Sequence, residues 1–161
     1  MIRGLPAELL DVLPDGLVIE TCPTAAKWWQ EAAELLAFGR LLTIDYGFKA
    51  EELLLPERSR GTLRAYHRHR VSDNPLSEPG EQDLTAHVNF SELIAAGEAR
   101  GLRTEAVTSQ GQFLSGIAVR IWENERAFGK WTPARTRQFQ TLTHPEHLGR
   151  AFRVLVQERG L

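Results

Sequence analysis

The clearest pattern in the chain is a run of apolar residues at helical spacing after Pro23. Apolar side chains recur three or four positions apart, as on one face of a helix, at Ala25, Trp28, Trp29, Ala32, Ala33 and Leu36. Thr24 can cap the first turn, and Gly39 can end the last one. The spacing predicts a helix over this segment, with both tryptophans facing the core.

Four segments have the apolar, β-branched composition of strands: 17–22, 40–47, 102–110 and 151–159. The second follows the predicted helix directly, as in the latter half of a βαβ unit, whose strand is typically parallel and covered on both faces. The last alternates apolar and polar residues, as a half-buried strand does. Strands that alternate with helices predict an α/β architecture.

Two more helices are indicated by their first residues. Asn89 and Glu92 have the spacing of a capping box, and Gly101 can close the helix that they begin. Thr132 followed by Pro133 favours a helix start, because proline at the first helical position loses no needed hydrogen bond. The apolar segment 111–119 fits either a helix or a buried loop.

Length and composition limit the possible classes of protein. The 161 residues suffice for one compact domain, residues 1–161, and are too few for two ordinary ones. The net charge of -2 gives no basic field for nucleic acid. The single cysteine, Cys22, forms no internal disulfide, which favours a reducing compartment. No apolar run approaches the roughly 20 residues of a membrane span, and the start of the chain lacks a leader pattern. We expect a cytoplasmic protein that binds neither nucleic acid nor membrane.

Residues 61–90 contain three of the five histidines of the chain, with charges that no simple amphipathic pattern explains. On a strand, alternate side chains share a face, so His67 and His69 would point together. Asp83 and His87 follow, also at alternate positions. Such a group suits a metal, a proton transfer or a substrate, and ordinary hydrogen-bonded surface residues are the alternative.

Taken alone, the spacing around His67 is that of the first cupin motif. A glycine, a His-x-His pair, an acid and a later glycine stand at Gly61, His67, His69, Asp73 and Gly80. Two histidines and a carboxylate are suitable ligands for zinc, iron or manganese. Cupins are nearly all strand, however, and a second cupin motif is not evident, so we expect no metal site. Neither a G-x-S-x-G nucleophile turn nor a glycine-rich nucleotide loop occurs.

Asp45 and Tyr46 close the predicted strand 40–47. In open α/β sheets, ligands bind outside the carboxyl ends of the strands. These two polar residues are therefore candidates for a functional site.

Several longer blocks resemble a known family. The segments GRLLTIDYG, RGTLRAYHRHR, PGEQDLTAHVNF, QGQFL and LGRAFRVLV occur in this order, much as in the MidA-type family of class I S-adenosylmethionine-dependent methyltransferases. The resemblance runs from residue 13 to the C-terminus. It implies the C-terminal half of a Rossmann-like methyltransferase fold, with 40–47 as the fifth strand, 102–110 as the sixth and 151–159 as an antiparallel seventh. The histidine-rich region would be an insertion over the active-site edge.

The resemblance also implies a chemistry. The mitochondrial relative is a protein arginine methyltransferase that acts in complex I assembly, so the complete enzyme would use S-adenosylmethionine, with a protein substrate possible. Asp45 and Tyr46 would face the methyl group of the donor, Asp45 being the better candidate to orient the nucleophile or accept its proton. Four inserted residues would shape the acceptor pocket or serve as scaffold: His67, His69, Asp83 and His87.

One departure from the family concerns the cofactor. Relatives carry, ahead of this region, a glycine-rich loop and an acidic residue for the ribose, and this sequence has neither. We therefore expect residues 1–161 alone to bind the cofactor weakly and to lack activity. The half-sheet would leave a face and an edge uncovered, which predicts a homo-oligomer or a complex with an N-terminal half. A non-catalytic protein-binding module and a metal-dependent cupin-like enzyme are the alternatives.

Overall fold

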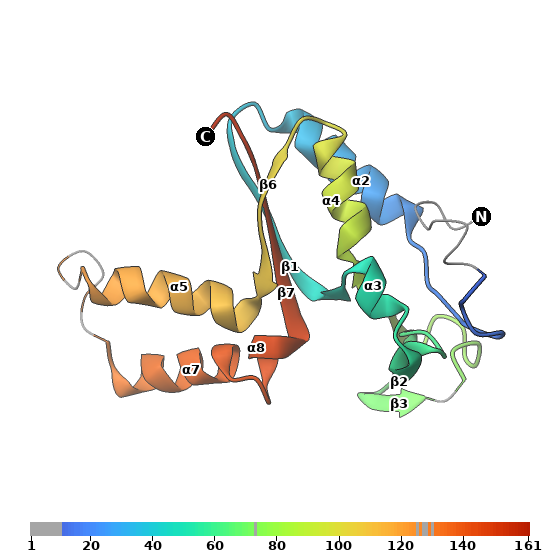
Figure 1. Cartoon of the computed structure of the whole chain (residues 1–161). Coiled ribbons are helices and arrows are strands. Elements are labelled where there is room, and N and C mark those ends of the chain that lie inside the picture. Colours follow the sequence, from blue (N-terminus) through green and yellow to red (C-terminus); the bar gives the residue numbers. More distant parts are fainter. Residues whose placement is uncertain (1–10, 73, 125, 127–128, 130) are drawn as a thin grey trace.

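The computed structural model describes residues 11–72, 74–124, 126, 129 and 131–161. The elements are α2 (Pro23–Leu35), β1 (Gly39–Phe48), α3 (Ala50–Leu53), η1 (Pro56–Arg58), β2 (Arg64–His67), β3 (Arg70–Ser72), β4 (Asp83–Thr85), β5 (Val88–Asn89), α4 (Phe90–Glu98), β6 (Arg103–Ser109), α5 (Gln110–Trp122), α7 (Pro133–Thr143), α8 (Leu148–Ala151) and β7 (Phe152–Arg159). The main sheet has the order β5-β1-β7-β6, and a small separate sheet has the order β3-β2-β4. The expected α/β architecture is confirmed (Figure 1).

Strand β7 lies in the middle of the main sheet and runs antiparallel to both β1 and β6. The antiparallel direction expected for the last strand is confirmed. The expectation that this strand is half-buried was wrong, because Val154 and Leu155, which point to opposite faces, are both 0% exposed.

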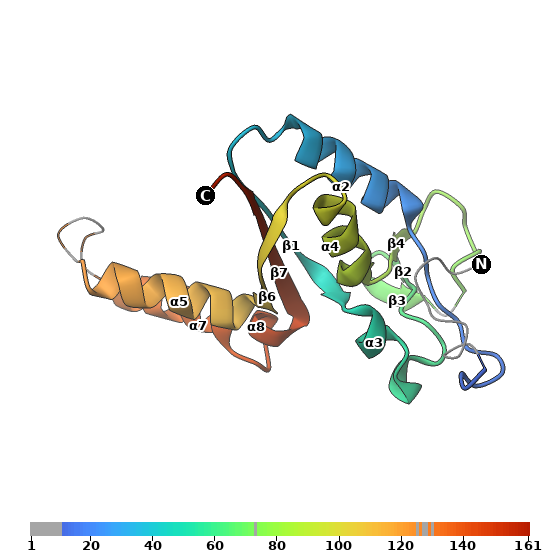
Figure 2. The same cartoon turned by 45° about the horizontal axis from the view of Figure 1, so that its top comes forward.

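One face of the main sheet is covered by α2 and α4, which lie side by side along it (Figures 1 and 2). The core cluster on this face consists of Trp29, Phe90, Leu93, Ala96 and Leu155. Within it, the Trp29 Nε1–H donates a hydrogen bond of 2.7 Å to Oε1 of Gln157, which is fully buried. The polar group of the strand and the polar edge of the indole therefore satisfy each other in the core.

The helix predicted after Pro23 is confirmed, with three corrections. It ends at Leu35, and Gly39, which was expected to end it, is the first residue of β1. It begins at Pro23, and its N-cap is Cys22, which forms no side-chain capping bond, so Thr24 is not the cap. Trp29 is buried, but Trp28 is 60% exposed. Only one of the two tryptophans therefore faces the core.

The other face of the main sheet is open along β1, although Val154 of the neighbouring strand β7 is buried on it. Leu42, Ile44 and Tyr46 alternate along β1 and are 44%, 40% and 45% exposed. The expectation that this strand is covered on both faces was therefore wrong. β1 pairs with β7 along one edge, and among the described residues its other edge has a partner only at Gly47 and Phe48. An apolar sheet face and a strand edge are thus accessible, as expected for a half-sheet.

Other expectations had mixed outcomes. Segment 17–22 is not a strand, and Val18 forms only an isolated bridge to Arg60. Asn89 caps α4 by accepting the Ser91 N–H, without the predicted capping box with Glu92. Thr132 caps α7, as predicted. Segment 111–119, for which helix and loop were both open, lies in the helix α5.

Helices α5 and α7 project from the sheet as a pair, as Figures 1 and 2 show. The rings of Trp122, Trp131 and Phe139 contact one another at centroid distances of 5.6 to 6.1 Å. An apolar hollow of about 360 Å³ lies between the two helices. None of the described helices has the length and apolar character that a membrane span requires.

Candidate functional site at the carboxyl end of β1

The last residues of β1 bring a carboxylate and an aromatic ring to the edge of the sheet. The Asp45 carboxylate accepts the backbone N–H of Tyr46 at 2.7 Å, which holds it close to the strand. The Tyr46 ring lies 3.9 Å from the ring of Phe152, its partner on β7. Asp45 and Tyr46 are both exposed, so they can meet a ligand.

Parallel pairing of β5 with β1 brings His87 to the same place. Gly47 lies opposite Val88, directly after His87 in the chain. A Cβ at Gly47 would collide with the Val88 carbonyl and with a core ring, so glycine is required there. The His87 ring lies 4.8 Å from that of Phe48 and 6.5 Å from that of Tyr46. Of the predicted site residues, the structure therefore brings the rings of Tyr46 and His87 together, and Asp45, the neighbour of Tyr46 in the strand, acts on His87 through its charge.

Charged groups surround the His87 ring. The Arg58 guanidinium lies 3.9 Å above the Phe48 ring, and its Nη1 donates to the Glu52 carbonyl oxygen at 2.8 Å. Burial lowers the pKa of His87 below its ordinary value of 6.5, and the positive charges of Arg58 and Arg64 lower it further. Negative charges nearby oppose this shift without reversing it. His87 is therefore neutral near pH 7.

A hydrogen-bonded group behind His87 fixes its backbone. The backbone N–H of His87 donates to Oγ1 of Thr62 at 2.9 Å. The Glu20 carboxylate accepts three hydrogen bonds, from Thr62 N (2.8 Å), Thr62 Oγ1 (3.0 Å) and Leu63 N (2.9 Å). Burial raises the pKa of Glu20, but the bonds from Leu63 and Thr62 outweigh burial and leave that pKa below its ordinary value. Glu20 is therefore an ionised anchor of the site.

The prediction that His67 and His69 share a strand face was wrong. His67 ends β2, and Arg68 and His69 form the two-residue turn to β3, with φ angles of 46° and 65°. His67 Nδ1 lies 3.3 Å from a Glu78 carboxylate oxygen but forms no hydrogen bond. Asp83 is exposed on β4. The small sheet thus carries three of the predicted site residues separately from the cluster around His87.

The metal alternative finds no set of ligands in the described part of the chain, where no three His, Cys, Asp or Glu side chains converge. Asp73, the acid of the cupin-like spacing, lies outside the described residues. The mixed architecture of helices and strands also differs from the nearly all-strand architecture of cupins.

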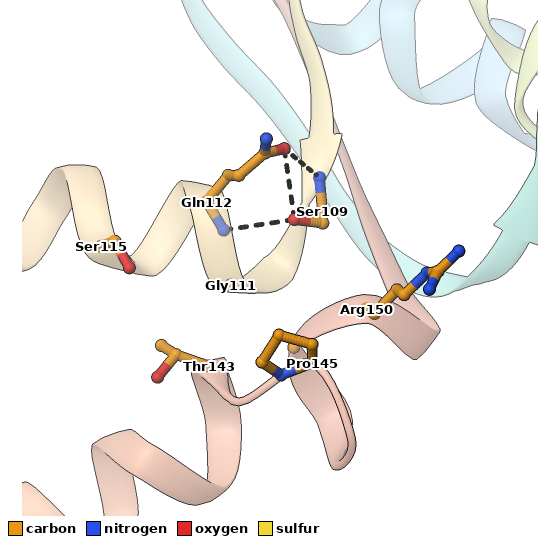
Figure 3. A pocket seen from close by; sticks show the side chains of 8 residues that line it. Ser109, Gly111, Gln112, Ser115, Thr143, Pro145 and Arg150 are labelled. Carbon is orange, nitrogen blue, oxygen red and sulfur yellow. Dashed lines mark hydrogen bonds between the residues drawn. The ribbon is translucent and has the colours of Figure 1, made fainter.

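Another hollow lies at the carboxyl end of β6, on the other side of β7 from β1 (Figure 3). Its volume is about 390 Å³, and Ser109 and Gln112 face Thr143 and Pro145 across it. The β7 register places Arg153 between Asp45 and Ser109, so this hollow begins two strands away from the end of β1. It is a separate hollow next to the α5–α7 pair.

The sequence did not predict three residues that surround or position His87: Glu20, Arg58 and Thr62. Glu20 was assigned to a strand, and its partner Thr62 lies 42 residues away. The one local signal was Gly61, whose φ of 72° and contact with Glu20 leave no room for a Cβ.

Comparisons with known proteins place these observations in a family. Residues 3–108 match the model of a family described as "Putative S-adenosyl-L-methionine-dependent methyltransferase". The chain is 34% identical over 107 residues to the rat "Protein arginine methyltransferase NDUFAF7, mitochondrial", covering 64% of this chain and 22% of the rat protein. It is 28% identical over 142 residues to the mouse protein of the same name, covering 83% of this chain and 30% of that protein.

Two solved structures from Burkholderia thailandensis are similar to nearly the whole chain. One, bound to S-adenosyl-homocysteine, has a TM-score of 0.78 and 33% identity, covering 96% of this chain and 41% of the solved one. The other, a native crystal structure, has a TM-score of 0.79 and 32% identity, covering 99% and 44%. The chain thus spans less than half of each solved protein and less than a third of these curated relatives.

Proposed function

The chain belongs to this family of S-adenosyl-L-methionine-dependent methyltransferases, and we propose that it forms the acceptor-binding side of such an enzyme. The observation that carries the proposal is that the rings of Tyr46 and His87 lie together at the carboxyl end of β1, with the Asp45 carboxylate next to Tyr46 in the strand. This is the end of the strand at which open α/β sheets bind their ligands. The accessible edge of β1 lies beside the same group.

The described residues do not enclose S-adenosylmethionine. That molecule bears an ammonium group, a carboxylate, a ribose and an adenine, so it needs a pocket that surrounds most of its surface. Asp45 and Tyr46 are exposed at the rim of an open sheet face, where the chain supplies one wall only. We infer that residues 1–161 alone bind the cofactor weakly and do not transfer methyl groups.

We propose a protein arginine as the methyl acceptor of the complete enzyme. The rat and mouse relatives are named as protein arginine methyltransferases, which supports this class. An aromatic ring at the site already holds a guanidinium, since Arg58 lies over Phe48. The nitrogen of an arginine releases a proton when it is methylated, and Asp45 is the carboxylate placed to accept that proton. Three residues of the small sheet are proposed to contact the acceptor farther from the methylated group: His67, His69 and Asp83.

The open face of the main sheet supports a proposal about partners. Leu42 and Ile44 are apolar and exposed there, and the neighbouring edge of β1 is available for strand pairing. The two solved relatives match this chain almost completely and extend well beyond it. We propose that the cofactor-binding part of the fold covers this face, with a homo-oligomer as the alternative cover.

A chimera tests the proposed function. Residues 1–161 would replace the matching segment of the Burkholderia thailandensis protein that binds S-adenosyl-homocysteine. Methylation of arginine in candidate proteins would then be followed with labelled S-adenosylmethionine. We expect transfer by the chimera and a loss of about 100-fold or more in Asp45→Asn, which keeps the shape of the side chain but cannot accept the proton. A fully active Asp45→Asn chimera would rule out the role of Asp45. A folded chimera that binds the cofactor but methylates no arginine would rule out the acceptor class.

A further inference from the structure

We propose that His87 acts as a neutral hydrogen-bond donor through its Nε2–H, not as a proton acceptor, and that Thr62 and Glu20 are the positioning residues that hold it. The inference rests on the proposed acceptor site, because it concerns what one residue of that site offers to a ligand. It states which kind of ligand atom the His87 ring would bind, namely a hydrogen-bond acceptor.

The first step concerns the two ring nitrogens. Nδ1 of His87 is enclosed and has no hydrogen-bond partner among the described residues. Buried N–H groups without a partner are rarer and costlier than buried acceptor atoms without one. The proton of the neutral ring is therefore placed on Nε2, which leaves an unprotonated Nδ1 in the enclosed position. In this tautomer, Nε2 donates to a ligand and has no lone pair with which to accept a proton.

The second step concerns the direction of the hydrogen bonds behind the ring. The Thr62 hydroxyl has a single hydrogen, and the ionised Glu20 carboxylate, 3.0 Å away, accepts it. The hydroxyl oxygen therefore turns a lone pair to the His87 backbone N–H, 2.9 Å away. Glu20 also binds the backbone N–H groups of Thr62 and Leu63, so the segment that carries this hydroxyl cannot swing away. Glu20 thus determines where the His87 backbone lies.

The charges that face the ring agree with the geometry. Arg58 and Arg64 disfavour a cationic imidazolium, whereas Glu20 and Asp45 favour it, and burial adds to the effect of the arginines. The balance leaves the ring neutral near pH 7. A second proton would have to occupy the enclosed Nδ1, where no residue in the described part of the chain accepts its hydrogen bond.

The consequence is a division of roles within the site. The Nε2–H of His87 suits an acceptor atom without positive charge, and we commit to a carbonyl oxygen in the backbone of the acceptor polypeptide. Asp45 then remains the proton acceptor at the end of β1. This hydrogen bond would set how far the acceptor polypeptide enters the site. Tyr46 and Phe48, whose rings flank His87, would lie beside that polypeptide.

Nitrogen NMR of the chain itself tests the tautomer. Long-range proton–nitrogen spectra of labelled protein distinguish the tautomers of all five histidines, and the signal missing in His87→Gln identifies His87. Should that variant fail to fold, contacts of the ring protons with Tyr46 and Phe48 give the assignment. We expect a protonated Nε2 and an unprotonated Nδ1 at neutral pH. An Nδ1–H tautomer or a cationic ring would overturn the proposal.

Hydrogen exchange tests the positioning residues. Thr62→Val keeps the shape of threonine without its hydroxyl, and Thr62→Ser is the matched control that keeps it. Exchange of the His87 amide should accelerate about five- to tenfold in the valine variant relative to the serine variant. In Glu20→Gln the His87 titration midpoint should move to lower pH, because a negative charge that favours the imidazolium is lost. Equal amide exchange in the two Thr62 variants would exclude positioning by Thr62. An unmoved midpoint would exclude the effect of the Glu20 charge on the His87 ring. None of these readouts needs methyl transfer, so an inactive chimera and a wrong tautomer remain separate failures.

Discussion

Replacing Gln157 by leucine is expected to weaken the fold, because this amide is fully buried in the central strand. Its Oε1 accepts the Trp29 indole N–H at 2.7 Å. Its Nε2 donates to the Ile94 carbonyl at 3.1 Å and to the Thr104 hydroxyl at 2.9 Å. Leucine fills almost the same volume but makes none of these bonds. In the variant, the indole N–H of Trp29, a residue that is 1% exposed, would stay in the core without a partner.

The expected loss follows from the three partners taken one by one. An unpaired buried donor costs about 1 to 3 kcal/mol. Among the residues that the structure describes, the Trp29 N–H has no acceptor other than Gln157. The Thr104 hydroxyl still donates to Glu98 at 2.7 Å, and the Ile94 carbonyl retains its place in the helix α4. Leucine also recovers the cost of burying an amide. We therefore expect Gln157→Leu to lower the free energy of unfolding by about 2 kcal/mol.

Urea unfolding followed by circular dichroism measures this loss, and a double-mutant cycle with Trp29→Phe tests its cause. Phenylalanine has no N–H, so the second substitution removes the unpaired donor that the first creates. The double variant should be more stable than the sum of the single losses predicts, by about 1 kcal/mol or more. Losses that add to within about 0.3 kcal/mol would refute the assignment of the cost to the indole N–H.

Three further changes give distinct results. Gly61→Ala should lower the free energy of unfolding by about 1 to 3 kcal/mol, because the φ of Gly61 is positive and the added Cβ meets the Glu20 carboxylate. Urea unfolding measures this loss, and an unchanged urea midpoint would contradict the prediction. Ile44→Lys on the open face should change the stability of the isolated chain by less than about 0.5 kcal/mol. It should reduce methyl transfer by the chimera if the rest of the fold covers that face, as we propose. The pKa of His87 is lowered in the fold, so the unfolded state binds the proton first as pH falls. Urea unfolding at several pH values should therefore show the wild type losing stability relative to His87→Gln below pH 6.5 and not above it.

Local patterns in the sequence predicted the elements whose cause is local. The helix over Pro23–Leu35 and the strand after it follow from periodicity within one short segment. Exposure of Trp28 did not follow, because only the position of α4 decides which side of the helix is covered. The direction of the last strand came from the family resemblance, since alternation of residues carries no information on pairing.

The candidate site was predictable only in part. Asp45 and Tyr46 follow from their place at a strand end, whereas His87 joins them through the pairing of β5 with β1, which no local pattern shows. The histidines at 67 and 69 looked like strand neighbours because alternate spacing is all that the residues reveal. The two positive φ angles of the turn are unusual for arginine and histidine, and a turn of this kind is normally signalled by asparagine or glycine.

Titration calorimetry with S-adenosylmethionine on residues 1–161 is the most direct test of the assignment of this chain to the acceptor side. The cofactor-binding relative from Burkholderia thailandensis serves as the positive control. We expect no binding in the micromolar range by the isolated chain, because its exposed strand end supplies one wall of the site. Micromolar binding with one cofactor per chain would contradict that assignment.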